Sequence, residues 1–184
     1  MLKDRYGNEL STGSTAARDA YGRGVDSLMA ATPGTDTAFA EAVAADEGFA
    51  LGHISLARAK QLMGRGHEAK APRARALELA AGTTPREQSH IAIFDKILTG
   101  QGEAALAAIK QHLESWPRDA LVLSLPLGAF GLFAFSGMAD HDRARHELCE
   151  RLARHYGEDW WFLTMAGWAM TENGDVARRR AVTE

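Results

Sequence analysis

The sequence has one cluster of histidine and cysteine, formed by His141, His146 and Cys149. Imidazole nitrogen and thiolate sulfur are ligands that zinc prefers. His146 and Cys149 are three residues apart and would share a face of a helix. A zinc site needs two further ligands nearby, and His155 lies nine residues beyond His146. The pattern therefore favours a half-buried cysteine and solvated histidines and predicts no metal, with a metal-binding or enzymatic helical protein as the alternative.

Glu87 and His90 could serve acid–base chemistry, but the residues before them give Glu87 another role. Thr84-Pro85-Arg86-Glu87 places threonine at a helix N-cap, proline at the first helical position and glutamate at the third. In such a capping box the glutamate accepts a hydrogen bond from the N-cap backbone N–H. His90 is then expected to pack or to face a groove. The sequence shows no Ser–His–Asp arrangement and no phosphate-binding glycine loop, so we expect a non-enzymatic protein without cofactors.

A basic stretch runs from Arg58 to Arg75 and contains a single acid, Glu68. It lacks the interleaved aromatic side chains on which nucleic-acid bases stack. The whole chain has 21 lysines and arginines against 24 acidic residues, a net charge of −3. This balance argues against a nucleic-acid partner and indicates a solvated helix face.

The elements that position these residues are predicted to be helices throughout. The chain has 34 alanines but ten valines and isoleucines together, which favours an all-α protein because alanine is the best helix former. Turn signals and apolar periodicity predict helices over 15–31, 39–46, 49–64, 68–81, 84–99, 103–116, 120–136, 140–156 and 159–172.

The predicted helices repeat with a regular period. Gly64, Gly100, Gly137 and Gly174 each follow the first helix of a pair, at spacings of 36, 37 and 37 residues. A period in the thirties with two helices per unit is typical of tetratricopeptide-type solenoids. The sequence therefore predicts a right-handed superhelix of about four and a half antiparallel helix pairs, with residues 1–184 as a single helical-repeat domain.

Several stretches carry a more specific resemblance. They are Asp4-Arg5-Tyr6-Gly7-Asn8, Leu10-Ser11-Thr12, Phe49-Ala50-Leu51-Gly52-His53, Thr84-Pro85-Arg86-Glu87, Ser89-His90, Trp116-Pro117-Arg118-Asp119-Ala120 and His155-Tyr156-Gly157-Glu158-Asp159-Trp160-Trp161-Phe162. Together they resemble the tetratricopeptide repeat protein 38-like family, which implies an all-α repeat fold and no established enzymatic activity. Members of that family continue with further helix pairs, so the resemblance implies an N-terminal portion, with the second helix of a fifth pair beginning within 175–184.

Residues 120–139 contain no charged side chain, which leaves a membrane-associated helical protein as another alternative. Pro126 and three glycines interrupt this segment, so we expect a helix buried between neighbours and no membrane contact. The first ten residues lack the apolar core of a signal peptide, and the single cysteine favours a reducing compartment. A cytoplasmic location is the resulting prediction.

Function is predicted from the geometry of helical repeats. Aligning the helix pairs places Asp26, Arg58 and Asp95 at equivalent positions of a concave groove, with Gln61 one turn beyond Arg58. Mixed charge there suits a protein or peptide partner, so the chain is predicted to be an interaction module. The helix over 159–172 is aromatic and methionine-rich on nearly every side, which predicts a homodimer through this C-terminal helix.

Overall fold

The computed structural model describes residues 1–128 and 130–174. The described residues are mostly helical, and the strands among them are two residues long. The prediction of an all-α protein is confirmed. The chain divides into two compact units, Met1–Gln101 and Gly102–Glu184. The helix predicted to begin within 175–184 lies outside the described residues.

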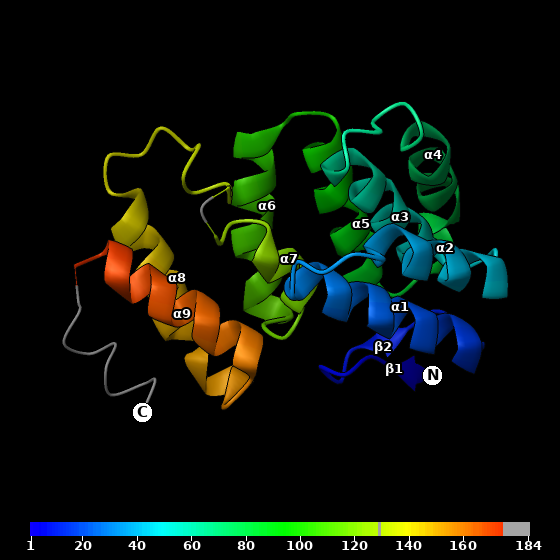
Figure 1. Cartoon of the computed structure of the whole chain (residues 1–184), viewed down its shortest axis with the longest axis horizontal. Coiled ribbons are helices and arrows are strands. Elements are labelled where there is room, and N and C mark those ends of the chain that lie inside the picture. Colours follow the sequence, from blue (N-terminus) through cyan, green and yellow to red (C-terminus); the bar gives the residue numbers. More distant parts are fainter. Residues whose placement is uncertain (129, 175–184) are drawn as a thin grey trace. The chain divides into compact units, whose positions relative to one another are not determined.

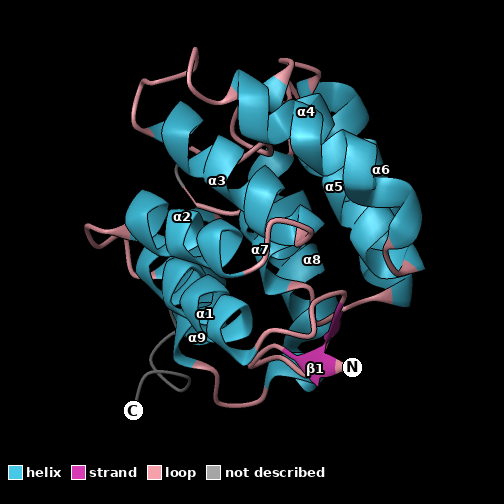
Figure 2. Cartoon of the chain, turned by 90° about the vertical axis from the view of Figure 1, so that its right-hand side faces the viewer, coloured by secondary structure: helices cyan, strands magenta, loops and turns pink. Residues whose placement is uncertain are grey.

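The first unit holds five α-helices and one short 3₁₀ helix (Figures 1 and 2). They are α1 (Thr15–Met29), α2 (Thr35–Ala45), α3 (Ala50–Leu62), α4 (Lys70–Leu79), η1 (Ala80–Gly82) and α5 (Pro85–Leu98). Helix α1 packs on α2 and α2 on α3, and α3 also contacts α1, α4 and α5. The core between the first three helices is aromatic: the Tyr21 ring lies 5.7 Å from that of Phe39 and 5.3 Å from that of Phe49.

Local signals define where these helices begin and end. The Ser14 side chain accepts a hydrogen bond from Ala17 N at 3.1 Å and caps α1. The predicted capping box is confirmed at α5, where Thr84 Oγ1 accepts from Glu87 N at 3.2 Å and Glu87 Oε2 accepts from Thr84 N at 3.1 Å. Gly64 and Gly100 follow α3 and α5 with φ of 73° and 76°, the left-handed conformation that commonly ends helices.

A small β-hairpin, which the sequence did not predict, precedes the first helix. Strand β1 (Leu2–Lys3) pairs antiparallel with β2 (Glu9–Leu10). The Asp4 carboxylate stabilises the turn between them, because Oδ1 accepts from the backbone N–H groups of both Tyr6 and Asn8 at 2.9 Å. The hairpin is tied to α5 because Arg86 donates from Nη2 to the Glu9 carbonyl at 2.9 Å.

The second unit contains the remaining helices of the described chain: α6 (Gly102–Ser115), α7 (Ala120–Ser124), α8 (His141–Tyr156) and α9 (Trp160–Glu172). Helices α8 and α9 pack together, and the Tyr156 ring stacks on that of Phe162 with centroids 4.5 Å apart. The buried guanidinium of Arg145 lies 4.3 Å from the centre of a Trp168 ring.

The prediction of a helix over 120–136 is wrong. Helix α7 ends at Ser124, because Pro126 has no N–H to continue the helical ladder and Gly128 adopts φ of 80°. The chain instead folds back on itself, with Leu132 N donating to the Leu125 carbonyl at 3.0 Å. A Cβ at position 131 would overlap the Leu127 carbonyl, so the return requires the glycine found there.

Because α7 ends at Ser124, two expectations that depended on a helix over 120–136 also fail. Gly137 has φ of 72° but does not directly follow a helix, so it does not close the first helix of a pair as predicted. The segment is also less buried than a core helix, since Phe130 and Phe135 are 91% and 72% exposed. None of the helices in the described parts of the chain has the length and apolar character needed to cross a bilayer.

Candidate functional site

The four predicted groove residues all lie in the first unit, on α1, α3 and α5. Arg58 and Gln61 are brought together on α3, where Arg58 Nη1 donates to Gln61 Oε1 at 2.6 Å. Asp26 on α1 forms an ion pair with Arg5, at 3.2 Å between Oδ1 and Nη1. Asp95 on α5 accepts from Arg73 Nε at 2.6 Å. Each acidic side chain is therefore neutralised by a cation outside the predicted set.

Arg58 differs from Asp26 and Asp95 because its side chain bonds to the neutral amide of Gln61 and not to an opposite charge. No carboxylate of the described residues forms an ion pair with it, and its hydrogen bond to Gln61 leaves further guanidinium donors available. The side chain is half-buried on the middle helix of the three, and burial lowers the pKa of its guanidinium. A partly desolvated cation interacts more strongly with an incoming anion than one surrounded by water.

Sequence reasoning missed Arg5 and Arg73 as neighbours of these positions. Arg5 lies in the hairpin turn, with its guanidinium carbon 4.6 Å from the centre of the Tyr6 ring. Arg73 belongs to the basic stretch and is half-buried against α5 through its pair with Asp95. Both pairings join residues more than 20 positions apart. The sequence signal that could have suggested such pairs is the near equality of acidic and basic residues, 24 against 21.

The basic stretch is distributed over separate ion pairs. Lys60 Nζ lies 2.6 Å from Glu68 Oε2, and Arg75 Nη1 lies 3.0 Å from Glu78 Oε2. Arg65 pairs with Asp36 of α2, and the guanidinium holds the pKa of that carboxyl below its usual range. Part of the stretch is thus half-buried and paired, where the sequence favoured a fully solvated face.

The histidine–cysteine cluster on α8 is more buried than predicted. His146 and Cys149 are 6% and 2% exposed, so the expectation of solvated histidines and a half-buried cysteine is wrong for this pair. The cause is the packing of α8, whose apolar face they share with Leu148 and Leu152. Burial raises the pKa of the Cys149 thiol to about 12. In residues 1–128 and 130–174, no three histidine, cysteine or acidic side chains form a group suited to a metal ion.

His90 is a packing residue, in line with one of its two predicted roles. It is buried on α5, and its ring stacks on Phe94 with centroids 4.5 Å apart. Glu87 is 0% exposed and does more than cap the helix, since Oε1 also accepts from Ser11 N at 2.9 Å. The Ser11 hydroxyl donates to the same carboxylate. The pair of residues is therefore structural.

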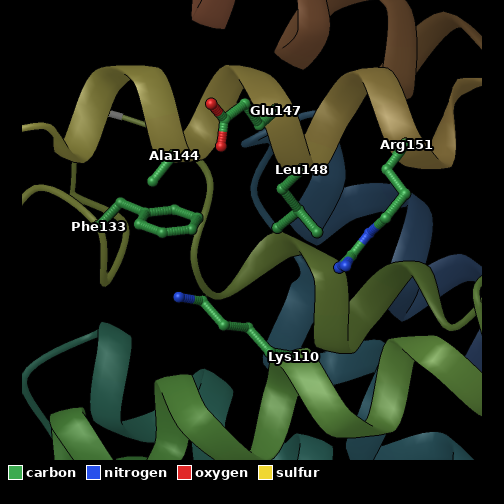
Figure 3. Close-up of a pocket in the computed structure, with 6 residues that line it drawn as sticks. All are labelled: Lys110, Phe133, Ala144, Glu147, Leu148 and Arg151. Atoms are coloured by element: carbon green, nitrogen blue, oxygen red, sulfur yellow. The ribbon is translucent and has the colours of Figure 1, made fainter.

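The second unit contains a hollow of about 340 Å³ that sequence reasoning did not identify (Figure 3). It is lined by Lys110 of α6, Phe133 of the loop after α7, and Ala144, Glu147, Leu148 and Arg151 of α8. Hollows of this size are within the range that holds small ligands. No sequence motif marks it, because Phe133 reaches it through the loop that was predicted to be helical.

Comparisons of the chain with protein-family models, with curated proteins and with solved structures found no match. The resemblance to the tetratricopeptide repeat protein 38-like family therefore stays a prediction.

Proposed function

We propose that this chain is a non-enzymatic, tetratricopeptide-like interaction module that binds an acidic peptide segment of a partner protein. The observation that carries the proposal is Arg58, a half-buried guanidinium that has no carboxylate partner among the described residues. The peptide would supply that carboxylate along the wall formed by α1, α3 and α5.

The packing of the first unit supports such a wall. Helix α3 contacts α1 and α5, and α2 and α4 pack against α3 as well. Contacts of this kind support the proposal, because in stacked helix pairs each helix packs on its neighbours and successive first helices form an extended binding surface. Repeats of this kind commonly bind extended or helical segments without catalysing a reaction.

The charges on the wall favour an acidic over a basic segment. Asp26 and Asp95 already have Arg5 and Arg73 as partners, so a basic peptide would have to displace an internal cation. An acidic peptide can pair with Arg58 without breaking an internal ion pair. A charge-assisted bond between guanidinium and carboxylate is about twice as strong as a neutral hydrogen bond.

The test is fluorescence anisotropy with a fluorescein-labelled hexaglutamate peptide at low ionic strength. We expect saturable binding that weakens about tenfold in Arg58→Gln, the loss typical of one charge-assisted contact. Arg75→Gln is the matched control, because Arg75 is exposed and pairs with Glu78. Asp95→Asn should tighten binding by releasing Arg73. Equal affinities of the Arg58 and Arg75 variants, or tighter binding of hexalysine than of hexaglutamate, would contradict the proposal.

A further inference from the structure

The hollow in the second unit has a charge arrangement unlike that of the wall in the first. Lys110 and Arg151 extend into the same space from α6 and α8 (Figure 3). Both are exposed, and neither forms an ion pair with a carboxylate of the described residues. Two cations in one hollow repel each other, so the site gains stability when an anion enters between them.

Phe133 contacts the ammonium end of Lys110. The Lys110 Nζ lies 5.5 Å from the centre of the Phe133 ring, within the range of a cation–π interaction. Phe133 is 0% exposed and is one of the residues that line the hollow. It is fixed by its backbone, because Phe133 N donates to the Pro126 carbonyl at 3.4 Å and its own carbonyl accepts from Ser136 Oγ at 2.7 Å. The contact places the Lys110 ammonium group beside a fixed ring.

Glu147 is the acidic residue of the lining, and it lies near another cation. Its Oε1 is 3.9 Å from Arg143 Nε on the same helix, and its side chain is 65% exposed. Arg143 also pairs with Asp140. The lining therefore has two cations that form no ion pair with a described carboxylate, against the single carboxylate of Glu147. This balance selects an anion over an ammonium group.

The rest of the lining is apolar. Ala144 and Leu148 lie on the α8 side, and the methylene stems of Lys110 and Arg151 add further apolar surface. A hollow of about 340 Å³ has room for a molecule larger than an inorganic ion. An anionic group at the two cations would place an attached hydrocarbon against these side chains.

We propose that the hollow lined by Lys110, Phe133, Ala144, Leu148 and Arg151 binds a small organic anion, with the anionic group between Lys110 and Arg151 and the hydrocarbon part against Ala144 and Leu148. The site is independent of the peptide proposal, because its residues belong to the other unit. Failure of one therefore leaves the other intact.

The experiment is a heteronuclear NMR titration of the whole chain with hexanoate, 1-hexanol and inorganic phosphate in parallel. We expect hexanoate to give saturable shifts in the amides of α6 and α8 around the hollow, at a Kd at least tenfold below that of hexanol or phosphate. Lys110→Gln and Arg151→Gln should each raise the Kd for hexanoate about tenfold. Arg154→Gln, which removes an exposed cation on the same helix, should leave it unchanged.

Glu147→Gln distinguishes an anion from an ammonium-bearing ligand. Removing this negative charge should lower the Kd for hexanoate, because the carboxylate opposes the incoming anion. Three results would overturn the proposal: hexanol binding as tightly as hexanoate, unchanged affinity in both the Lys110 and Arg151 variants, or weaker hexanoate binding in Glu147→Gln. Phosphate binding as tightly as hexanoate would overturn the organic part of the assignment.

Discussion

Replacing Glu87 by alanine removes a carboxylate that joins the hairpin segment to the start of α5. Its oxygens accept from Ser11 N at 2.9 Å and Thr84 N at 3.1 Å, and the Ser11 hydroxyl donates to them as well. Bonds to a charged acceptor contribute roughly 1.5–3 kcal/mol each, and the half-buried donors would regain part of this from water. We expect the free energy of unfolding to fall by about 3 kcal/mol, against about 1 kcal/mol for Thr84→Ala, which removes the N-cap alone.

Urea unfolding followed by far-ultraviolet circular dichroism measures this loss. With a slope of about 2 kcal/mol per molar, the midpoint of Glu87→Ala should fall by about 1.5 M. Tryptophan fluorescence adds a probe of the second unit, because all four tryptophans lie beyond residue 101. The first unit should lose its helical signal at lower urea than the tryptophans report.

Glu41→Ala is the matched control within the same unit. Its carboxylate pairs with Arg23 at 2.7 Å, but both side chains are more than half exposed, so the pair contributes at most about 1 kcal/mol. Equal midpoints for the Glu87 and Glu41 variants would refute the reasoning. Glu87→Gln, which keeps one acceptor oxygen, should lie between Glu87→Ala and the unsubstituted protein.

Three further predictions concern packing, reactivity and assembly. Gly24→Ala would place a Cβ 2.5 Å from Phe39 Cε1 and should destabilise the protein by about 1–3 kcal/mol, whereas Gly22→Ala meets no atom within 4 Å and should stabilise it by up to about 1 kcal/mol; equal urea midpoints would count against this packing. The Cys149 thiol, with its pKa raised to about 12, should resist a disulfide reagent at pH 8 until the protein is unfolded in urea, and prompt labelling of the native protein would show that the burial is wrong. Light scattering should give a dimer mass that Trp160→Glu reduces to the monomer, since Trp160 on α9 is 48% exposed; a monomer mass for the unsubstituted chain would exclude the dimer.

The helices that local signals define were predictable from the sequence. Thr84 and Glu87 sit three residues apart, and the capping box they form needs no information from the rest of the chain. Gly64 and Gly100 likewise mark helix ends through their own backbone conformation. Such signals place an element but do not show what it packs against.

Contacts between distant residues were not predictable in the same way. Ser11 and Glu87 are 76 positions apart, and the hairpin that this bond helps to fix has strands of two residues. Strands so short show no alternating pattern, so the hairpin gave no signal. The partners of Asp26 and Asp95 were missed for the same reason, because a charge in the sequence does not identify the charge that will lie beside it.

The segment after α7 does not form the helix that its apolar residues favour, but backbone hydrogen bonds still hold it in a defined turn. Its apolar residues suggest a helix, but Pro126 removes one donor and the glycine at 131 allows a turn in which a Cβ would overlap a carbonyl. The same turn leaves Phe130 91% exposed and Phe133 0% exposed, three residues apart. A continuous helix would not form the hydrogen bonds from Leu132 N to the Leu125 carbonyl and from Phe133 N to the Pro126 carbonyl, which place Phe133 at the hollow. Because Phe133 contacts Lys110, the segment that departs from the predicted helix also lines the proposed anion site, as expected where function competes with local regularity.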